Sequence, residues 1–378
     1  MGGVSFTFDT TVPQLASATM TLMPKPVQNL RLLRGIAIVM ACVGLSGCWA
    51  GYALRQGLSQ ASLLLRQKPL AEALRELPPR QAELAEIAHQ AKEFGVSHIG
   101  LRNTGNYDTY VDVGRDALTY VVSAAPRDRL EPHLWHFPIV GAVPYKGFFS
   151  KKDALAEQQK LESRGLDTYV RGVAAFSLLG ILRDPLYSTM LHGTPGDIAN
   201  TVIHEMTHGT VFLSGNATFN EGFATYVGDE GSLEFLAERF GMNAPEYRQA
   251  VDEQQDSATF SAFIASAIAD LRTFYSRTDL TAQQKIAGRQ ALFEEFKTRY
   301  RTLAFHRPGY GRFLDEPLNN AYFLLFDTYE RDLGRFARAR RHFGSLRAMV
   351  AFFRDTVARK PDPAAYFQDW ENRLPPGR

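Results

Sequence analysis

The stretch "TVIHEMTHGT", residues 201–210, holds two histidines four positions apart, with a glutamate directly after the first. Residues four positions apart lie on the same face of a helix, so His204 and His208 can bind one metal ion together. Glu205 is turned roughly 100° away around the helix and can reach a water bound to that ion. The spacing predicts a zinc site with a catalytic base, the H-E-x-x-H arrangement of metal-dependent peptide hydrolysis. The alternative is two surface histidines that match the pattern by chance.

A third ligand is offered by "FNEGFATYVGDE", residues 219–230, which reads as the next helix. A short helical hairpin can fold Glu221 back onto the two histidines. Two histidines and one glutamate with an open fourth position form a catalytic zinc arrangement, whereas structural zinc sites are closed by four protein ligands. We therefore expect His204, His208 and Glu221 to hold one Zn²⁺ per chain.

The helix that carries "HEMTH" has a clear predicted start. Thr194 can cap it, Pro195 suits the first helical position, and Asp197 can complete a capping box. Gly215 is expected to end it after residue 213. Most of the chain that follows also has a helical pattern, and the expected helices span 195–213, 219–240, 245–303 (a pair), 319–341 and 344–359. An irregular segment is expected at 304–317.

The residues before this helix have a mixed pattern. We expect helices within 49–94, with Gly95 as the last cap, a β-hairpin over 106–125, strands at 133–140 and 167–176, and a helix over 151–165. The predicted fold class is therefore α+β: a mixed lobe, 48–193, precedes a mainly helical lobe, 194–378. The metal site is expected where the two lobes meet.

"HEMTH" followed by "NEGFATYV" resembles the gluzincin metallopeptidases, in which the glutamate of a helical Asn-Glu pair is the third zinc ligand. The short gap between the motifs is similar to that of a bacterial family designated aminopeptidases, often lipoproteins. Stretches similar to "VPYKGFFS", "VRGVAAFSLLGILRDPLYSTML" and "LNNAYFL" also occur in that family. The resemblance covers roughly residues 60–371. It implies a gluzincin-like fold and an aminopeptidase activity, although the amine-recognising Gly-x-Met-Glu-Asn segment of the best-known aminopeptidases is absent before His204.

Peptide hydrolysis also needs a second donor for the developing oxyanion, and relatives use a tyrosine or histidine for it. Tyr145, Tyr310 and Tyr322 are candidates, and each could equally be an ordinary buried aromatic residue. Asp229 could orient a ligand imidazole or belong to a solvated helix end. Asn320, in the pair Asn319-Asn320, could bind substrate or serve the start of a helix.

The N-terminal region reads as a targeting signal. Two arginines precede an apolar run, 35–45, which is too short to span a membrane and suits a signal-peptide core. The run ends in "LSGC", which resembles a bacterial lipobox and predicts lipidation of Cys48 after removal of residues 1–47. Residues 1–22 hold no basic residue, so Met23 is the expected true start. A buried N-terminal helix is the alternative.

The charge and the cysteine content of the chain limit its possible partners and cross-links. The formal charge of +2, without a dense basic run, argues against a nucleic-acid partner. Both cysteines lie within the first 48 residues, so a disulfide framework is excluded from the rest of the chain. We expect a monomer that is lipid-anchored in the bacterial cell envelope. The outer membrane, periplasmic face, is favoured because Trp49 rather than aspartate follows the cysteine.

The sequence thus predicts a zinc-dependent hydrolase of peptide substrates, named an aminopeptidase by resemblance, with Glu205 as the base. Two alternatives stay open. One is a non-enzymatic envelope lipoprotein with a vestigial zinc site, and the other is an endopeptidase with a cleft open at both ends.

Overall fold

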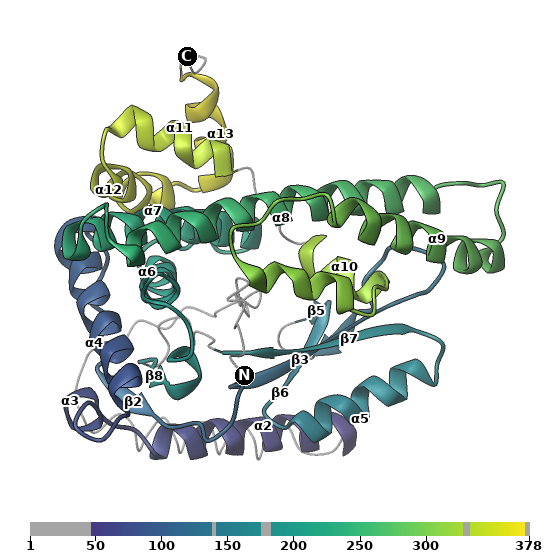
Figure 1. The fold of residues 1–378 in the computed structure, drawn as a ribbon, viewed down its shortest axis with the longest axis horizontal. Coiled ribbons are helices and arrows are strands. Elements are labelled where there is room, and N and C mark those ends of the chain that lie inside the picture. The colour runs from purple at the N-terminus through teal and green to yellow at the C-terminus, as the bar shows by residue number, and fades with distance from the viewer. Residues whose placement is uncertain (1–46, 138–140, 175–182, 328–332, 375–378) are drawn as a thin grey trace.

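The computed structural model describes residues 47–137, 141–174, 183–327 and 333–374 (Figure 1). The predicted signal peptide lies outside these residues except for Gly47, and so does the expected start at Met23. None of the described helices combines the length and apolar character needed to cross a bilayer.

The first part of the described chain mixes helices with short strands. Its elements are α2 (Gly47–Leu65), β1 (Lys68–Pro69), α3 (Leu70–Ala73), α4 (Pro79–Phe94), the π-helical turn η1 (Gly95–Ile99), β2 (Thr109–Val111), β3 (Thr119–Ala125), β4 (Trp135–Phe137), β5 (Gly141–Val143), β6 (Tyr145–Phe148), α5 (Lys151–Glu162), β7 (Asp167–Val173), β8 (Leu186–Tyr187) and the 3₁₀ turn η2 (Ser188–Met190).

Helices dominate the second part. They are α6 (Pro195–Thr210), α7 (Ala217–Phe240), α8 (Pro245–Tyr275), α9 (Ala282–Tyr300), the 3₁₀ segment η3 (Pro308–Asp315), α10 (Asn320–Asp327), α11 (Leu333–Phe343), α12 (Leu346–Asp355), the 3₁₀ turn η4 (Val357–Arg359) and α13 (Pro363–Asn372). The α+β class is therefore confirmed, with small sheets and a predominance of helix. The division into two lobes at residue 193 stays a prediction.

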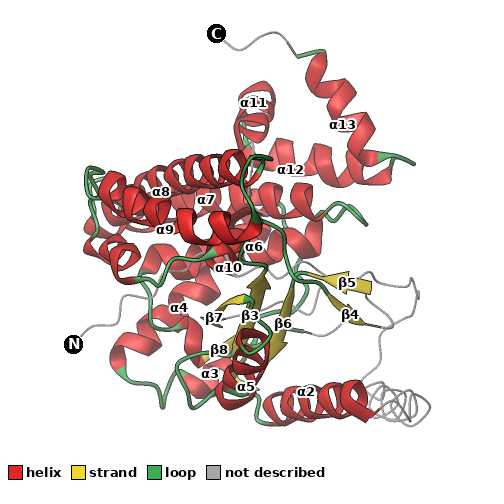
Figure 2. Ribbon diagram, turned by 90° about the vertical axis from the view of Figure 1, so that its right-hand side faces the viewer, coloured by secondary structure: helices red, strands yellow, loops and turns green. Residues whose placement is uncertain are grey.

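The strands form three small sheets, with the orders β1-β2-β8, β6-β3-β7 and β4-β5. The antiparallel sheet β6-β3-β7 lies in the middle of the molecule, with α10 on one face and α5 on the other (Figure 2). The sheet β1-β2-β8 pairs β2 with β8 in parallel. This second sheet matters for the site, because the segment entering β2 runs beside α6.

The predicted hairpin over 106–125 is wrong. Its two halves, β2 and β3, belong to different sheets, and each has neighbours on both edges: β1 and β8 for β2, and β6 and β7 for β3. The guanidinium of Arg115 donates to the carbonyls of Ala117 and Leu118 and stabilises a loop between the strands. Alternation of polar and apolar residues indicates extended chain with one buried face, and it does not say which strand pairs with which.

Two predicted helix ends differ in detail. Helix α4 ends at Phe94 with Gly95 at its C-cap, as predicted, but the backbone of Gly95 is right-handed and the chain continues through η1 to Gly100, whose φ of 81° is left-handed. A side chain at Gly95 would come within 3.2 Å of Leu101, so this glycine allows close packing. The helix over "HEMTH" ends at Thr210, and Gly215, with a φ of 75°, turns the following loop.

Other predictions hold in part. The expected helix over 151–165 corresponds to α5, and the strands expected at 133–140 and 167–176 correspond to β4 and β7. Residues 138–140 and 175–176 lie outside the described residues. The segment 304–317, which was expected to be irregular, contains the 3₁₀ segment η3. Helix α13 was not predicted from the sequence.

Two buried clusters organise the helices. The first, called the site core, joins α4, α6, α7, α11, α12 and α13 and includes Ile203, Met206, Phe223, Phe336 and Phe353. The second, called the aromatic core, lies between α8, α9, η3 and α10 and includes Phe260, Phe263, Phe296, Tyr300 and Phe323. The two histidines of interest lie on a helix of the site core.

Candidate metal site

The start of α6 is fixed by a capping box, as the sequence predicts. The Thr194 hydroxyl accepts a hydrogen bond from the Asp197 amide at 3.2 Å, and the Asp197 carboxylate accepts one from the Thr194 amide at 2.8 Å. Pro195 opens the helix, where its missing N–H costs nothing. The cap sets where the helix begins, and so which face His204 and His208 present.

Small residues on α7 let it approach α6 closely. A side-chain carbon at Gly228 would lie 3.2 Å from the Cβ of His204, and one at Gly231 would lie 2.7 Å from Ile99 and 3.1 Å from Ile203. Glycine at these two positions therefore removes the bulk that would push the helices apart. The result is a helix pair tight enough for a side chain of α7 to reach the histidines of α6.

The register of α7 is fixed by two asparagines at its start. Asn216 caps the helix by accepting from the Phe219 amide at 3.0 Å. The buried side chain of Asn220 accepts from the Leu213 amide at 2.7 Å and donates to the Leu213 carbonyl at 2.9 Å. This clamp ties the loop between the helices to the first turn of α7 and so places the next residue, Glu221.

His204, His208 and Glu221 meet at the contact between α6 and α7. The two Nε2 atoms of the histidines lie 3.1 Å apart, and the Glu221 carboxylate oxygens lie 3.6 Å from His208 Nε2 and 3.8 Å from His204 Nε2. Metal–ligand bonds of about 2.0–2.2 Å separate tetrahedral ligands by roughly 3.3–3.6 Å. All three side chains are buried, and their ligand atoms lie within 4.8 Å of one another. The group could bind a metal ion.

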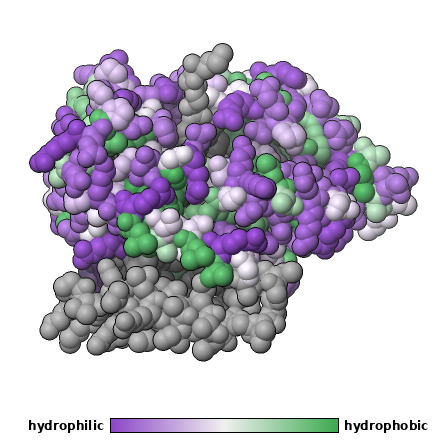
Figure 3. Space-filling model, turned by 90° about the horizontal axis from the view of Figure 1, so that it is seen from below, coloured by the Kyte–Doolittle hydropathy of each residue, from purple (hydrophilic) through white to green (hydrophobic). Residues whose placement is uncertain are grey.

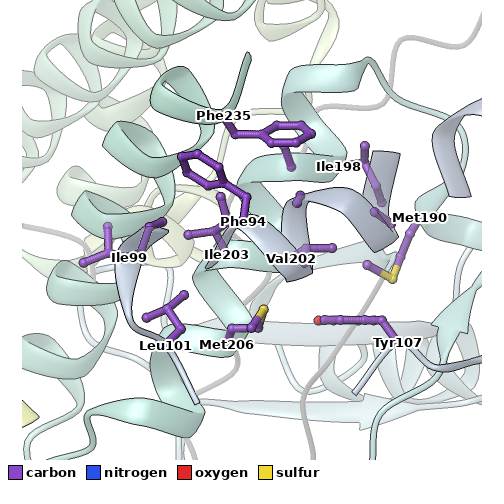
Figure 4. Close-up of a cluster of buried hydrophobic side chains, with 14 of the residues drawn as sticks. Phe94, Ile99, Leu101, Tyr107, Met190, Ile198, Val202, Ile203, Met206 and Phe235 are labelled. Carbon is purple, nitrogen blue, oxygen red and sulfur yellow. The ribbon is translucent and has the colours of Figure 1, made fainter. Parts of the chain in front are cut away.

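Glu205 is buried at 4% exposure on the same helix. The negative charge of Glu205 acts on Tyr107, a buried residue of the site core (Figure 4). Burial raises the pKa of Tyr107 well above its usual range, and the negative charge of Glu205 raises it further.

The three tyrosines proposed as oxyanion donors have other surroundings. Tyr310 donates to Glu253 at 2.9 Å, and Tyr322 packs edge-on against Tyr169; both belong to the aromatic core. Tyr145 lies in β6, paired with Ser123 of β3.

The remaining polar candidates have structural contacts. Asp229 accepts a hydrogen bond from the side chain of Asn200 at 2.7 Å, which joins α7 to α6. Asn319 accepts from the Tyr322 amide at 2.9 Å, in the manner of a helix cap. Asn320 is fully buried and donates to the carbonyls of Pro126 and Arg129.

Comparison with known proteins gives one positive finding. A family model described as "Putative aminopeptidase" matches residues 51–362, which is most of the chain. Searches of curated proteins and of solved structures find no match.

Proposed function

The chain belongs to this putative aminopeptidase family, and we propose that it is a zinc-dependent peptide hydrolase that removes residues from the amino end of peptides. The observation that carries the proposal is the buried group of His204, His208 and Glu221, with Glu205 on the same helix. The family match supports peptide hydrolysis. The two-histidine, one-glutamate donor set fits zinc, because this set leaves one position open for water.

In this proposal the three ligand side chains would hold Zn²⁺. When bound, the ion would act as a Lewis acid on a water and on the peptide carbonyl. The Glu205 carboxylate takes a proton from the attacking water as the water oxygen bonds to the carbonyl carbon. The same carboxyl group then gives that proton to the departing amine as the C–N bond breaks. Burial of all four side chains strengthens these interactions by excluding bulk water.

The experiment compares the full chain with its Glu205→Gln variant. Metal content is measured by elemental analysis, and turnover is measured on aminoacyl fluorophores and on internally quenched peptides blocked at the amino end. We expect one zinc in both proteins and a release of the fluorophore that is about 100-fold to 10,000-fold slower in the variant than in the unchanged chain. Hydrolysis of the blocked peptides alone would assign an endopeptidase instead. Absence of stoichiometric metal would contradict the proposal and favour a binding lipoprotein without enzymatic activity.

We further propose that the protein is a monomer anchored by a lipid on Cys48, on the periplasmic face of the bacterial outer membrane. Supporting this, α2 begins at the expected lipidation site, has no acidic residue and exposes Leu54, Leu58 and Leu65 along one face. Figure 3 views the molecule from the side on which α2 lies, and hydrophobic residues gather in the middle of that view. Labelling cells with a radioactive fatty acid should mark the protein, and Cys48→Ser should abolish the label.

A further inference from the structure

Helix α2 exposes a row of leucines along one face. Leu54, Leu58 and Leu65 are 48%, 60% and 81% exposed. Since a helix turns by roughly 100° per residue, these three positions fall within about 40° of one another around the helix. They form an apolar line, called the leucine stripe, along a helix of 19 residues. Large apolar side chains that gather on one exposed face indicate an interaction surface.

The opposite face of α2 holds the helix on the protein. The Tyr52 hydroxyl donates to the Gly147 carbonyl of β6 at 2.6 Å, and the Gln56 side chain accepts from the Phe149 amide at 2.9 Å. Leu63 is buried in the site core. By the helical repeat, these three side chains of α2 lie roughly 140–180° around the helix from the leucine stripe. The contacts therefore keep the stripe directed away from the protein.

The surface around the leucine stripe carries positive charge. Helix α2 contains no aspartate or glutamate, and Arg55 within it and Arg66 just after it are exposed. Two further exposed cations, Lys151 and Lys152, open α5 directly after the segment that contacts α2 through Phe149. An apolar stripe edged by cations is typical of a helix that lies on an acidic bilayer surface, with its apolar face among the lipid chains.

Two observations favour a membrane over another protein as the partner of this face. The expected lipidation site, Cys48, is the second residue of α2, so a lipid there would bring the start of the helix to a bilayer. The exposed cations complement acidic lipid phosphates. A second copy of the chain, paired through the same face, would instead bring these cations against one another, which costs free energy.

We propose that α2 lies flat on an acidic phospholipid surface, with the leucine stripe among the lipid chains and Arg55 and Arg66 at the phosphate groups. The inference rests on the proposed membrane location, and it adds to the lipid a second point of attachment. Attachment at two points fixes the orientation of the protein. Helices α11, α12 and α13 lie on the side of the molecule opposite to α2 and so project away from the membrane (Figure 1, Figure 2).

The first test places a photoreactive benzophenone amino acid in the full chain in place of Leu58. The protein is made in bacteria, their membranes are irradiated, and the products are identified by mass. We expect a product with a phospholipid. The same group in place of Ile286, an exposed residue of α9, is the matched control and should give at least about 10-fold less of this product. Equal yields at both positions, including none, would overturn the inference, and so would a product from position 58 that joins two copies of the chain, or the chain and another protein, in place of lipid.

The second test measures what the leucine stripe contributes. The purified full chain with the photoreactive group at position 58 is reconstituted with vesicles of phosphatidylcholine and phosphatidylglycerol in equal parts. Leu54→Gln with Leu65→Gln should lower the yield of the lipid product by at least about 10-fold. The control, Met242→Gln with Ile286→Gln, should leave it unchanged. Because all four side chains are exposed, the melting temperature should stay the same in both variants. An unchanged yield in the leucine variant would overturn the inference.

The contribution of the arginines is measured by comparing these vesicles with vesicles of phosphatidylcholine alone. Arg55→Gln with Arg66→Gln should lower the yield in the acidic vesicles by about 5-fold for each arginine, and should leave it unchanged in the neutral vesicles. High salt should lower the yield from the unchanged chain by screening the same charges. Equal yields from the two kinds of vesicle would overturn the assignment to an acidic surface.

Fatty-acid labelling separates this inference from the proposed anchor. Contact of position 58 with phospholipid, in a chain that takes up no fatty acid, would overturn the anchor on Cys48 and support the membrane-facing helix. Uptake of fatty acid without that contact would overturn the inference and support the anchor.

Discussion

Buried carboxylates occur in two regions of this molecule, and their partners differ. Near the aromatic core, Asp256 accepts from the amides of His306 and Arg307 at 2.9 and 2.8 Å, and Asp167 accepts two bonds from Arg289 at 2.5 and 3.0 Å. Where α6 contacts α7, Glu221 lies 3.6 and 3.8 Å from two imidazoles. The first distances join donor to acceptor directly, whereas the second leave room for an ion between ligands.

The two sets of distances indicate different roles for the buried carboxylates. A carboxylate in direct contact with several donors stabilises the fold, because its desolvation is offset by hydrogen bonds. A carboxylate that faces imidazole nitrogens across a longer distance leaves room for an ion between the two kinds of ligand. Burial alone does not distinguish the two regions, since all of these carboxylates are shielded from water.

Loss of Glu221 should give the largest effect. Glu221→Ala removes one of three ligands, so we expect loss of stoichiometric metal and of measurable hydrolysis. Metal content after dialysis and turnover of an aminoacyl fluorophore measure the two quantities. Glu230→Ala, on the same helix, is the control and should retain both. If Glu221→Ala bound as much metal as the unchanged chain, Glu221 would not be a metal ligand and would not differ in role from the buried carboxylates of the other region.

Glu205→Gln should come next. We expect turnover to fall about 100-fold to 10,000-fold, the usual contribution of a general base, while the metal stays bound. Glutamine has the same shape, so a large loss of stability is not expected. Initial rates and elemental analysis of one preparation measure both. Retention of more than a tenth of the activity would argue against Glu205 as the base.

A substitution in the other region should affect stability and spare the metal. Arg289→Leu leaves the carboxylate of Asp167 buried without its main partner, which should lower the free energy of unfolding by about 3–5 kcal/mol. Urea unfolding measures this loss. Arg299→Leu breaks the more exposed pair with Asp270 and should cost about 0–1 kcal/mol. Loss of metal from the Arg289→Leu protein while it remains folded would contradict the view that this region stabilises the fold without affecting the metal site.

The smallest effect concerns pH. A hydrogen bond to Asp256 raises the pKa of His306 above its usual value of 6.5. Because the pKa is higher in the folded than in the unfolded chain, this stabilisation is complete below pH 6.5 and is lost as the pH rises through the folded pKa. His306→Gln should therefore differ most from the unchanged chain at low pH and least at high pH. Denaturant midpoints across this range test the sign.

Local features of the site could be predicted from the sequence. The capping box at Thr194 and the common face of His204 and His208 follow from helical periodicity and from neighbours in the chain. The position of Glu221 beside the two histidines could be predicted because it requires only that two consecutive helices fold back on each other. These features depend on interactions between residues close in sequence, so patterns in the sequence indicate them.

Features that depend on distant partners could not be predicted. Strand β2 pairs with β1 and β8 because of how the whole chain folds, and alternation predicted a hairpin with β3 instead. The left-handed backbone of Tyr107 depends on contacts with Asp184 and, through Asp108, with Lys92. The role of Gly95 in close packing against Leu101 likewise becomes visible only in three dimensions.

Helix α8 runs across both regions (Figure 1). It is 31 residues long: Ala250, near its start, packs in the site core, and Phe260 to Tyr275 contribute to the aromatic core. A single continuous helix therefore takes part in two cooperative units. Amide hydrogen exchange should find two protection levels along it, with the first turns opening together with α6 and the last turns opening together with α9. Local opening in one region then need not release the other.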